Sequence, residues 1–296
     1  MTVARAYLAL SIDTRGFDAE RLEAECFAAG ALSVTYTDLR DDPILEPAPG
    51  ELRLWPATQL QALFAPEDAS AALLARLAGN AGLPLERIAV SALAERAWER
   101  DWLATLRARR FGRRLWVCPL NEQVSEPQAV VVRLNPGLAF GTGEHPTTAL
   151  CLQWLDAHLA PQAEVIDYGC GSGILAVAAL KLGARCAHAY DIDPQALDAT
   201  RDNAARNQVS AALSVCESDA QLPARADLVI ANILAGPLCA LAPRFAQLVR
   251  PGGSLVLAGM LASQVPEVTH AQSACFDIAP FGSQDGWIGL AGTRIN

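Results

Sequence analysis

Several features that mark particular classes of protein are missing from this 296-residue sequence. No segment reaches the run of about eighteen apolar residues that a membrane helix needs, and the opening stretch "MTVARAYLALSID" lacks the long apolar run of a signal peptide. The eight cysteines are scattered without a C-x-x-C pair, and none of the four histidines has metal-ligand spacing to another. We therefore expect a cytoplasmic protein with reduced thiols, no membrane association and no bound metal.

Basic residues are in the minority, with 23 against 32 acidic residues and a net charge of −9. This balance argues against electrostatic binding of bare DNA or RNA and is compatible with a basic partner. Only one of the basic residues, Lys181, is a lysine, which we attribute to a compositional bias. Apolar residues are abundant at 52%, so the chain is globular and long enough for two domains.

The first 93 residues alternate strand and helix patterns in the order β-α-β-β-α-β. The expected strands are "AYLALSI", "ALSVTYT", "ELRLWPA" and "ERIAVSAL", and the expected helices are "FDAERLEAECFAAG" and "PEDASAALLARLAG". This order is the ferredoxin-like plan. Residues 1–93 carry seven basic and thirteen acidic residues, a net charge of −6. We predict an acidic α+β domain of ferredoxin-like type over residues 1–93.

A connecting helix and linker are expected over residues 94–127, beginning with "AERAWERDWLATLRARR". Five arginines lie between Arg107 and Arg114. They could contact phosphate or an acidic surface, or they could form a solvated face with local ion pairs, and we favour the second interpretation.

From residue 128 onward, strands and helices alternate. The last two predicted strands, "CFDIAPF" and "GWIGLAGTRI", leave little room for a helix between them. This pattern predicts a parallel α/β sheet that is completed by an antiparallel hairpin.

The stretch "VIDYGCGSG" places Gly169, Gly171 and Gly173 between a strand and a helix. A dinucleotide motif would need a glycine where Ile174 stands. Twenty-two residues after Gly169, the next strand ends at Asp191, where a carboxylate can accept both hydroxyl hydrogens of a ribose. Together these residues predict a nucleoside site without a pyrophosphate, and S-adenosylmethionine is the obvious candidate.

A second glycine-rich loop, "FGTGEHPTT", precedes the helix "ALCLQWLDAHL". Gly141 and Gly143 allow a tight loop, and Thr147 or Thr148 can lie at the helix start. The N–H groups there attract a carboxylate such as the amino-acid end of the same cofactor. His145 lies in this loop, and without a second histidine at ligand spacing we expect no metal there.

The strand "ADLVIAN" ends at Asn232, on the edge of the sheet that faces the ligand crevice. An amide there can accept a hydrogen bond from an amine substrate or donate one to the cofactor. Capping of the next helix is the structural alternative.

Four segments together resemble the bacterial methyltransferases of large-subunit ribosomal protein eleven. The resemblance implies a Rossmann-like class I methyltransferase domain over residues 128–296 behind an N-terminal substrate-recognition domain. In that family Thr148, Gly169, Asp191 and Asn232 correspond to cofactor-binding positions, and the glycine pattern adds Gly171. No role is assigned to Glu144. The segments are "LNPGLAFGTGEHPTT", "VIDYGCGSGILAVAALKLGA", "DIDPQALDATRDNAARN" and "VIANILAGPL".

The resemblance also implies an activity: methyl transfer from S-adenosylmethionine to lysine ε-amino and N-terminal α-amino groups of that ribosomal protein. We expect a monomer that acts on the free, basic protein before assembly, without direct DNA binding. The alternative is a methyltransferase acting on RNA or a small amine, although an RNA enzyme should carry a basic face.

The chemistry requires an uncharged amine, and a free lysine has a pKa of about 10.4. Acidic residues beside the nucleophile would raise that pKa further, so we expect a nearly neutral acceptor pocket and assign the acidity of residues 1–93 to docking. Asn232 and backbone carbonyls are the expected orienters of the amine, and no dedicated general base is visible.

Overall fold

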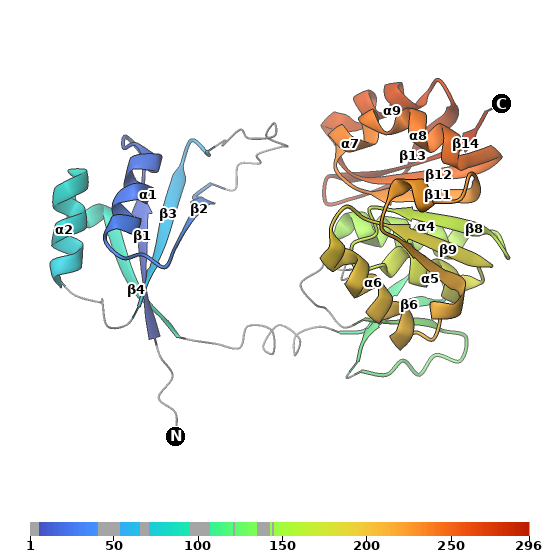
Figure 1. Cartoon of the computed structure of the whole chain (residues 1–296), viewed down its shortest axis with the longest axis horizontal. Coiled ribbons are helices and arrows are strands. Elements are labelled where there is room, and N and C mark those ends of the chain that lie inside the picture. Colours follow the sequence, from blue (N-terminus) through green and yellow to red (C-terminus); the bar gives the residue numbers. More distant parts are fainter. Residues whose placement is uncertain are drawn as a thin grey trace. The chain divides into compact units, whose positions relative to one another are not determined.

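The computed structural model describes residues 6–40, 54–65, 71–94, 107–120, 122–134, 143 and 145–295. The chain forms two compact units, Met1–Asp101 and Trp102–Asn296 (Figure 1). Within the described ranges, no helix combines the length and the apolar character that crossing a membrane would require.

The first unit contains a four-stranded sheet with two helices on one face. The strand order is β2-β3-β1-β4, and every neighbouring pair is antiparallel. Side chains of both helices pack on alternate residues of β1 and β3, such as Leu10, Leu60 and Phe64, so this face carries the core. The element order is the one that the sequence predicts. The elements are β1 (Ala6–Asp13), α1 (Ala19–Ala28), β2 (Ser33–Asp38), β3 (Thr58–Phe64), α2 (Ala71–Ala81), the short 3-10 turn Leu85–Arg87 and β4 (Ile88–Ala94).

The third strand lies later than the sequence prediction placed it. Residues 51–57 were expected to form it, but β3 begins at Thr58 and the described residues 54–57 precede it. Pro56 has no N–H to donate to a ladder, which disfavours a strand there. The alternation that decides the position is the buried set Leu60, Ala62 and Phe64, whose members are separated by the less buried Gln61 and Leu63.

The second unit is built on a seven-stranded sheet of order β10-β9-β8-β11-β12-β14-β13. The first five strands in this order are parallel, and β14 at the end pairs antiparallel with both β12 and β13. The predicted parallel sheet with a terminal antiparallel hairpin is therefore confirmed. The strands are β8 (Glu164–Tyr168), β9 (Cys186–Tyr190), β10 (Leu213–Cys216), β11 (Ala226–Asn232), β12 (Val249–Leu261), β13 (Phe276–Gln284) and β14 (Trp287–Arg294).

Helices cover both faces of this sheet (Figure 1). One core cluster contains side chains of the first three helices of the unit and the other contains side chains of the last three. Val165 and Ile166 of β8 are both fully buried. They belong to different clusters because successive residues of a strand face opposite sides of the sheet. The helices are α4 (Pro146–His158), α5 (Ile174–Leu182), α6 (Pro194–Arg206), α7 (Ala235–Ala240), α8 (Ala242–Leu248) and α9 (Val265–Gln272), with 3-10 turns at Ser210–Ala212, Asp219–Gln221 and Ala262–Gln264.

Part of the expected linker is a structural element of this second unit. β5 (Arg109–Phe111) and β6 (Leu115–Pro119) form a small sheet with β7 (Val130–Leu134). Their side chains Phe111 and Leu115 belong to the same buried cluster as residues of α4 and α5. Most of the expected connecting helix, residues 95–106, lies outside the described residues.

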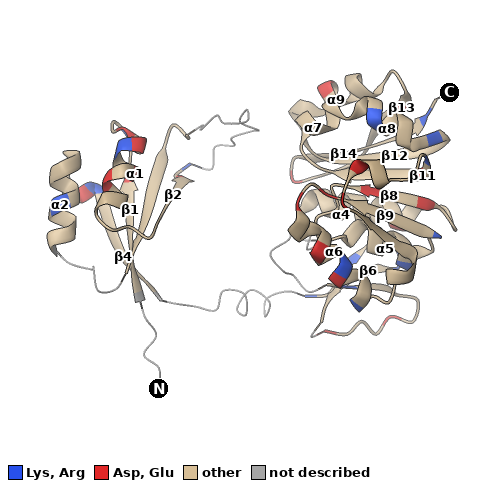
Figure 2. Ribbon diagram, viewed as in Figure 1, with Lys and Arg blue, Asp and Glu red and all other residues tan. Residues whose placement is uncertain are grey.

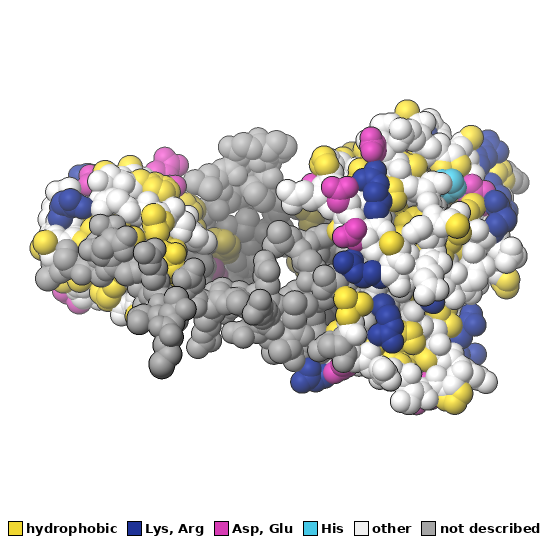
Figure 3. Space-filling view, turned by 60° about the horizontal axis from the view of Figure 1, so that its bottom comes forward, with side chains coloured by type: hydrophobic (Ala, Val, Ile, Leu, Met, Phe, Trp, Pro, Cys, Tyr) yellow, Lys and Arg dark blue, Asp and Glu magenta, His cyan; other side chains and the backbone are white. Residues whose placement is uncertain are grey.

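The five arginines between Arg107 and Arg114 lie just before β5, within it and in the turn that leads to β6. Arg107 forms an ion pair with Glu122 at 3.6 Å, and Arg114 forms one with Asp156 at 3.8 Å. Figure 2 shows both signs of charge spread over the second unit, and in the face drawn in Figure 3 several of its basic side chains lie beside acidic ones.

Candidate functional site

A cavity of about 640 Å³ lies at the carboxyl ends of the central parallel strands. Gly169 follows β8, Asp191 follows β9 and Asn232 ends β11, so three loops converge there. Gly171 also lines the cavity. Thr148 lies beside it in α4, is only 1% exposed, and is connected to it through Asn232. The structure thus brings the five predicted residues together.

Asp191 is held in place by backbone donors on both sides. Its Oδ2 accepts a hydrogen bond from the N–H of Gly171 at 2.8 Å, and its Oδ1 accepts one from the N–H of Asp193 at 3.0 Å. An ionised carboxylate has about four lone-pair sites, so about two remain for a ligand. Two neighbouring ribose hydroxyls would use those sites.

Two glycines enclose the residue that follows Asn232. Gly169 has φ +78° and Gly259 has φ +99°, in the left-handed region that favours glycine. A Cβ on Gly169 would collide with Cγ2 of Ile233, and a Cβ on Gly259 would collide with the carbonyl of Ile233. Glycine at both positions therefore lets the segment after β11 pack against its neighbouring strands, in addition to opening the cavity.

The amide of Asn232 is oriented by a threonine. Its Nδ2 donates to Oγ1 of Thr148 at 3.2 Å. Within the described part of the chain, the Oδ1 of this amide accepts no hydrogen bond, so it remains available as an acceptor at the cavity wall.

His145 lies at the entrance to α4 and caps that helix. Its Nδ1 lies 2.7 Å from Oγ1 of Thr147 and also accepts from the N–H of Thr147 at 3.4 Å. The imidazole packs edge-on against Trp287 with centroids 5.0 Å apart, and both rings line the cavity. Burial lowers the pKa of His145, which favours the neutral imidazole. Gly141 and Glu144 lie outside the described residues.

The remaining wall of the cavity is mostly aromatic and aliphatic. Tyr168 and Tyr190 pack edge-to-face with centroids 5.0 Å apart, and Ile192 beside them is 88% exposed. Burial, with Asp219 nearby, raises the pKa of Tyr168 and keeps its phenol neutral. No motif in the sequence marks these residues or Trp287, although the position of Ile192 directly after Asp191 is a signal for it.

Asp167 is a fully buried carboxyl group at the end of β8. One oxygen accepts from the N–H of Ala176 in the first turn of α5 at 2.9 Å, and the other has no partner among the described residues. Burial raises the pKa of Asp167 to about 7, and the negative charge of Asp191 acts in the same direction.

These features define a class I methyltransferase of Rossmann-like architecture. The glycine loop after β8 and the carboxylate after β9 line one cavity, and this cavity lies at the carboxyl ends of the parallel strands in a mixed seven-stranded sheet. The free acceptor sites of Asp191 and the apolar walls fit the nucleoside half of S-adenosylmethionine.

Comparison with known proteins identifies the family. The chain matches the family "Ribosomal protein L11 methyltransferase (PrmA)" over residues 6–295. A ribosomal protein L11 methyltransferase of Pseudomonas aeruginosa (strain LESB58) is 51% identical over 277 residues, which cover 93% of this chain and 94% of the relative. Another, from Azotobacter vinelandii (strain DJ / ATCC BAA-1303), is 49% identical over 288 residues and 97% of each chain.

A solved structure is also similar. The crystal structure of ribosomal protein L11 methylase from Lactobacillus delbrueckii subsp. bulgaricus has 32% sequence identity and a TM-score of 0.60, and the match covers 64% of this chain and 100% of that one. The chain belongs to the ribosomal protein L11 methyltransferase family, and its cofactor is S-adenosylmethionine.

Proposed function

We propose that this chain transfers methyl groups from S-adenosylmethionine to lysine ε-amino groups and the N-terminal α-amino group of ribosomal protein L11. The family and the names of its relatives support the reaction and the substrate. The structural observation that carries the proposal is the amide of Asn232, which Thr148 orients at the cavity wall with its oxygen available to an amine.

The proposed cofactor-binding residues are Thr148, Gly169, Gly171, Asp191 and Asn232. Asp191 would accept the ribose hydroxyls with the lone pairs that its backbone donors leave free. The start of α4 would attract the carboxylate of the methionine half, because the first N–H groups of a helix lack partners within it. Thr148 would act through the orientation of Asn232.

The chemistry depends on presenting an uncharged amine. When bound, S-adenosylmethionine would supply an electrophilic methyl carbon on its sulfonium sulfur. The uncharged amine nitrogen would bond to that carbon in line with the carbon–sulfur bond that breaks, leaving a neutral thioether. The chain positions the amine through Asn232 and excludes water with the apolar wall of the cavity.

Few charges surround the proposed acceptor site. Asp191 is the one acidic residue among those lining the cavity in the described part of the chain, and its proposed partner is the ribose. Burial lowers the pKa of His145, which disfavours a positive charge at this wall of the cavity. A cavity with little net charge avoids stabilising the ammonium form of lysine, whose deprotonation at pH 7 already costs roughly 4–5 kcal/mol.

Residues 1–93 are proposed to recognise the substrate. Their net charge of −6 complements a basic ribosomal protein, and acidic docking away from the acceptor amine would not raise the pKa of that amine. We further propose that the enzyme is a cytoplasmic monomer and methylates free L11 before assembly.

One assay separates this proposal from its alternatives. The purified chain is incubated with labelled S-adenosylmethionine and with free L11, intact large subunits, ribosomal RNA or a small amine. Label in free L11 at the highest rate is the expected result. Preferential labelling of RNA or of the small amine would instead support the alternative class of acceptor.

A further inference from the structure

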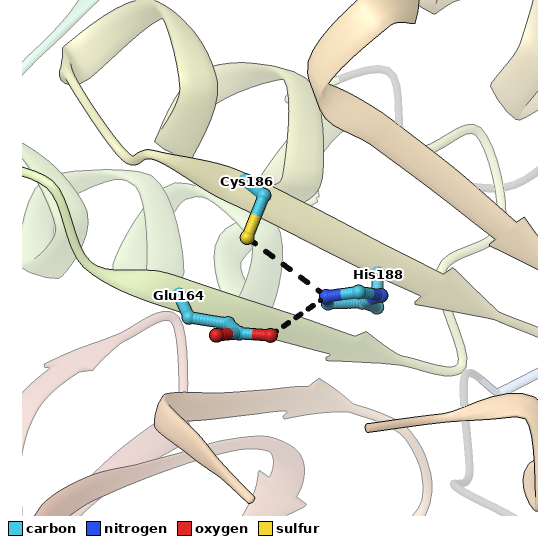
Figure 4. A group of neighbouring side chains, drawn as sticks. All are labelled: Glu164, Cys186 and His188. Atoms are coloured by element: carbon cyan, nitrogen blue, oxygen red, sulfur yellow. Dashed lines mark hydrogen bonds and ion pairs between the residues drawn. The ribbon is translucent and has the colours of Figure 1, made fainter.

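Three side chains of different metal-ligand types cluster on β8 and β9, toward the amino ends of these strands and away from the carboxyl ends that line the cofactor cavity. Glu164 is the first residue of β8, and Cys186 and His188 lie on the neighbouring strand β9 (Figure 4). Their side chains point toward one another, and their ligand atoms all lie within 4.8 Å of each other. The register that pairs Glu164 with Cys186 brings them together.

The distances between these atoms resemble the edges of a tetrahedral metal site. Nε2 of His188 lies 3.0 Å from Oε1 of Glu164 and 3.9 Å from Sγ of Cys186. With Zn–N and Zn–O bonds of about 2.1 Å and a Zn–S bond of about 2.3 Å, a regular tetrahedron requires separations of about 3.4 Å and about 3.6 Å. The first observed distance is shorter than its tetrahedral value and the second is longer, each by less than half an ångström, and small rotations of the half-buried side chains would close these differences.

An ion pair alone explains only part of the arrangement. The contact between His188 and Glu164 accounts for the 3.0 Å distance, but it does not explain why the thiol of Cys186 lies 3.9 Å from the same nitrogen. A cation would bring all three atoms to one centre. The second carboxylate oxygen of Glu164 is held by Arg185 at 2.5 Å, which leaves Oε1 as the single ligand oxygen.

We propose that Glu164, Cys186 and His188 form a three-ligand site for a zinc ion, with water completing the tetrahedron. Zinc is the metal that this mixture of thiolate, imidazole and carboxylate suits best. All three ligands are half-buried, so water would supply the fourth position. Because Glu164 lies four residues before Tyr168 on an extended strand, the site lies about 13 Å along β8 from the cofactor edge and would tie β8 to β9 without taking part in methyl transfer.

The site can be tested on the full-length protein. Metal is first removed with a chelator, and zinc is then titrated in competition with a chromophoric chelator. Wild type should bind one tight equivalent. Glu164→Gln, Cys186→Ser and His188→Ala should each weaken binding by about 100-fold or more, because loss of even an outer partner of a metal site costs about 10–100-fold.

Matched variants outside the cluster control for adventitious binding. His270→Ala and Cys275→Ser remove the same ligand types from the region of α9 and should leave the tight equivalent unchanged. Glu164→Gln changes one atom of a half-buried side chain, so it tests the site even if His188→Ala fails to fold.

Cobalt supplies an independent readout of the ligand set. The Co²⁺-loaded wild type should show a thiolate-to-metal charge-transfer band and the strong visible bands of tetrahedral coordination, and Cys186→Ser should lose the charge-transfer band. Zinc affinity that is equal in wild type and Glu164→Gln would overturn the proposal. A cobalt spectrum without thiolate ligation would do the same.

Discussion

Replacing Asp191 with alanine removes a carboxylate whose two oxygens each accept one backbone hydrogen bond, from Gly171 and from Asp193. If the remaining lone pairs bind two ribose hydroxyls, the variant loses two charge-assisted hydrogen bonds worth about 1.5–3 kcal/mol each. The loss of about 3–6 kcal/mol corresponds to roughly a 10²–10⁴-fold increase in the Kd for S-adenosylmethionine.

The same change also removes acceptors from two backbone N–H groups, so a stability effect must be separated from a binding effect. Asp193→Ala is the matched control, because Asp193 has the same side chain two residues away and caps α6 by accepting from the N–H of Gln195 at 2.9 Å. Its loss should cost about 1 kcal/mol of folding free energy and leave cofactor affinity unchanged.

Affinity is measured by titration calorimetry, and folding is measured by urea denaturation of the same preparations. The expected result is a large increase in Kd for Asp191→Ala and little change for Asp193→Ala. A folded Asp191→Ala protein with wild-type affinity would refute the ribose assignment. Equal losses of affinity in both variants would show that loop stability, and not a direct contact, controls binding.

Three further predictions follow from the second unit. Asn232→Asp puts a negative charge beside the amine and favours its ammonium form, so single-turnover methylation of L11 at saturating cofactor and pH 7 should fall about tenfold or more; an unchanged rate would remove Asn232 from the acceptor site. Asp167 has a folded pKa of about 7 against an ordinary value of 3.8, so the unfolded chain ionises first and stability should fall by roughly 4 kcal/mol between pH 4 and 7. Asp167→Asn cannot ionise, and urea denaturation across that range should show a flatter profile than wild type; parallel profiles would contradict the assigned pKa. A fragment of residues 102–296 should bind cofactor but methylate L11 poorly, and full activity of this fragment on L11 would disprove the recognition role of residues 1–93. A shorter fragment of residues 128–296 should be unstable to heat, because it lacks Phe111 and the rest of the β5–β6 hairpin.

The sequence predicted the parts of the site that depend on strand ends. Gly169, Asp191 and Asn232 each end or follow a strand, and the carboxyl ends of parallel strands meet at one edge, so their proximity follows from the fold class alone. Trp287 could not be found in this way. It reaches the cavity because β14 pairs with β12 in a register that places Trp287 opposite Leu261, and that register is not visible in a single sequence.

Two kinds of feature could not be predicted from the sequence: contacts between side chains on neighbouring strands, and very short strands. Spacing along the chain does not reveal that Glu164 and His188 are close, because they meet through the pairing of β8 with β9. The strand β5 has only three residues, Arg109–Phe111, two of them arginines, so no periodicity identified it. It forms because Phe111 is buried against the helices of the second unit, a tertiary effect that local pattern does not contain.

The position of Ile233 between Gly169 and Gly259 has a consequence for how this family can change in evolution. A side chain at position 169 would meet the Cγ2 methyl of Ile233, so a smaller residue at 233 could partly compensate for it. A side chain at position 259 would meet the backbone carbonyl of residue 233, which no substitution there removes. Positions 169 and 233 should therefore vary together where they vary, and position 259 should stay glycine whatever its neighbours become.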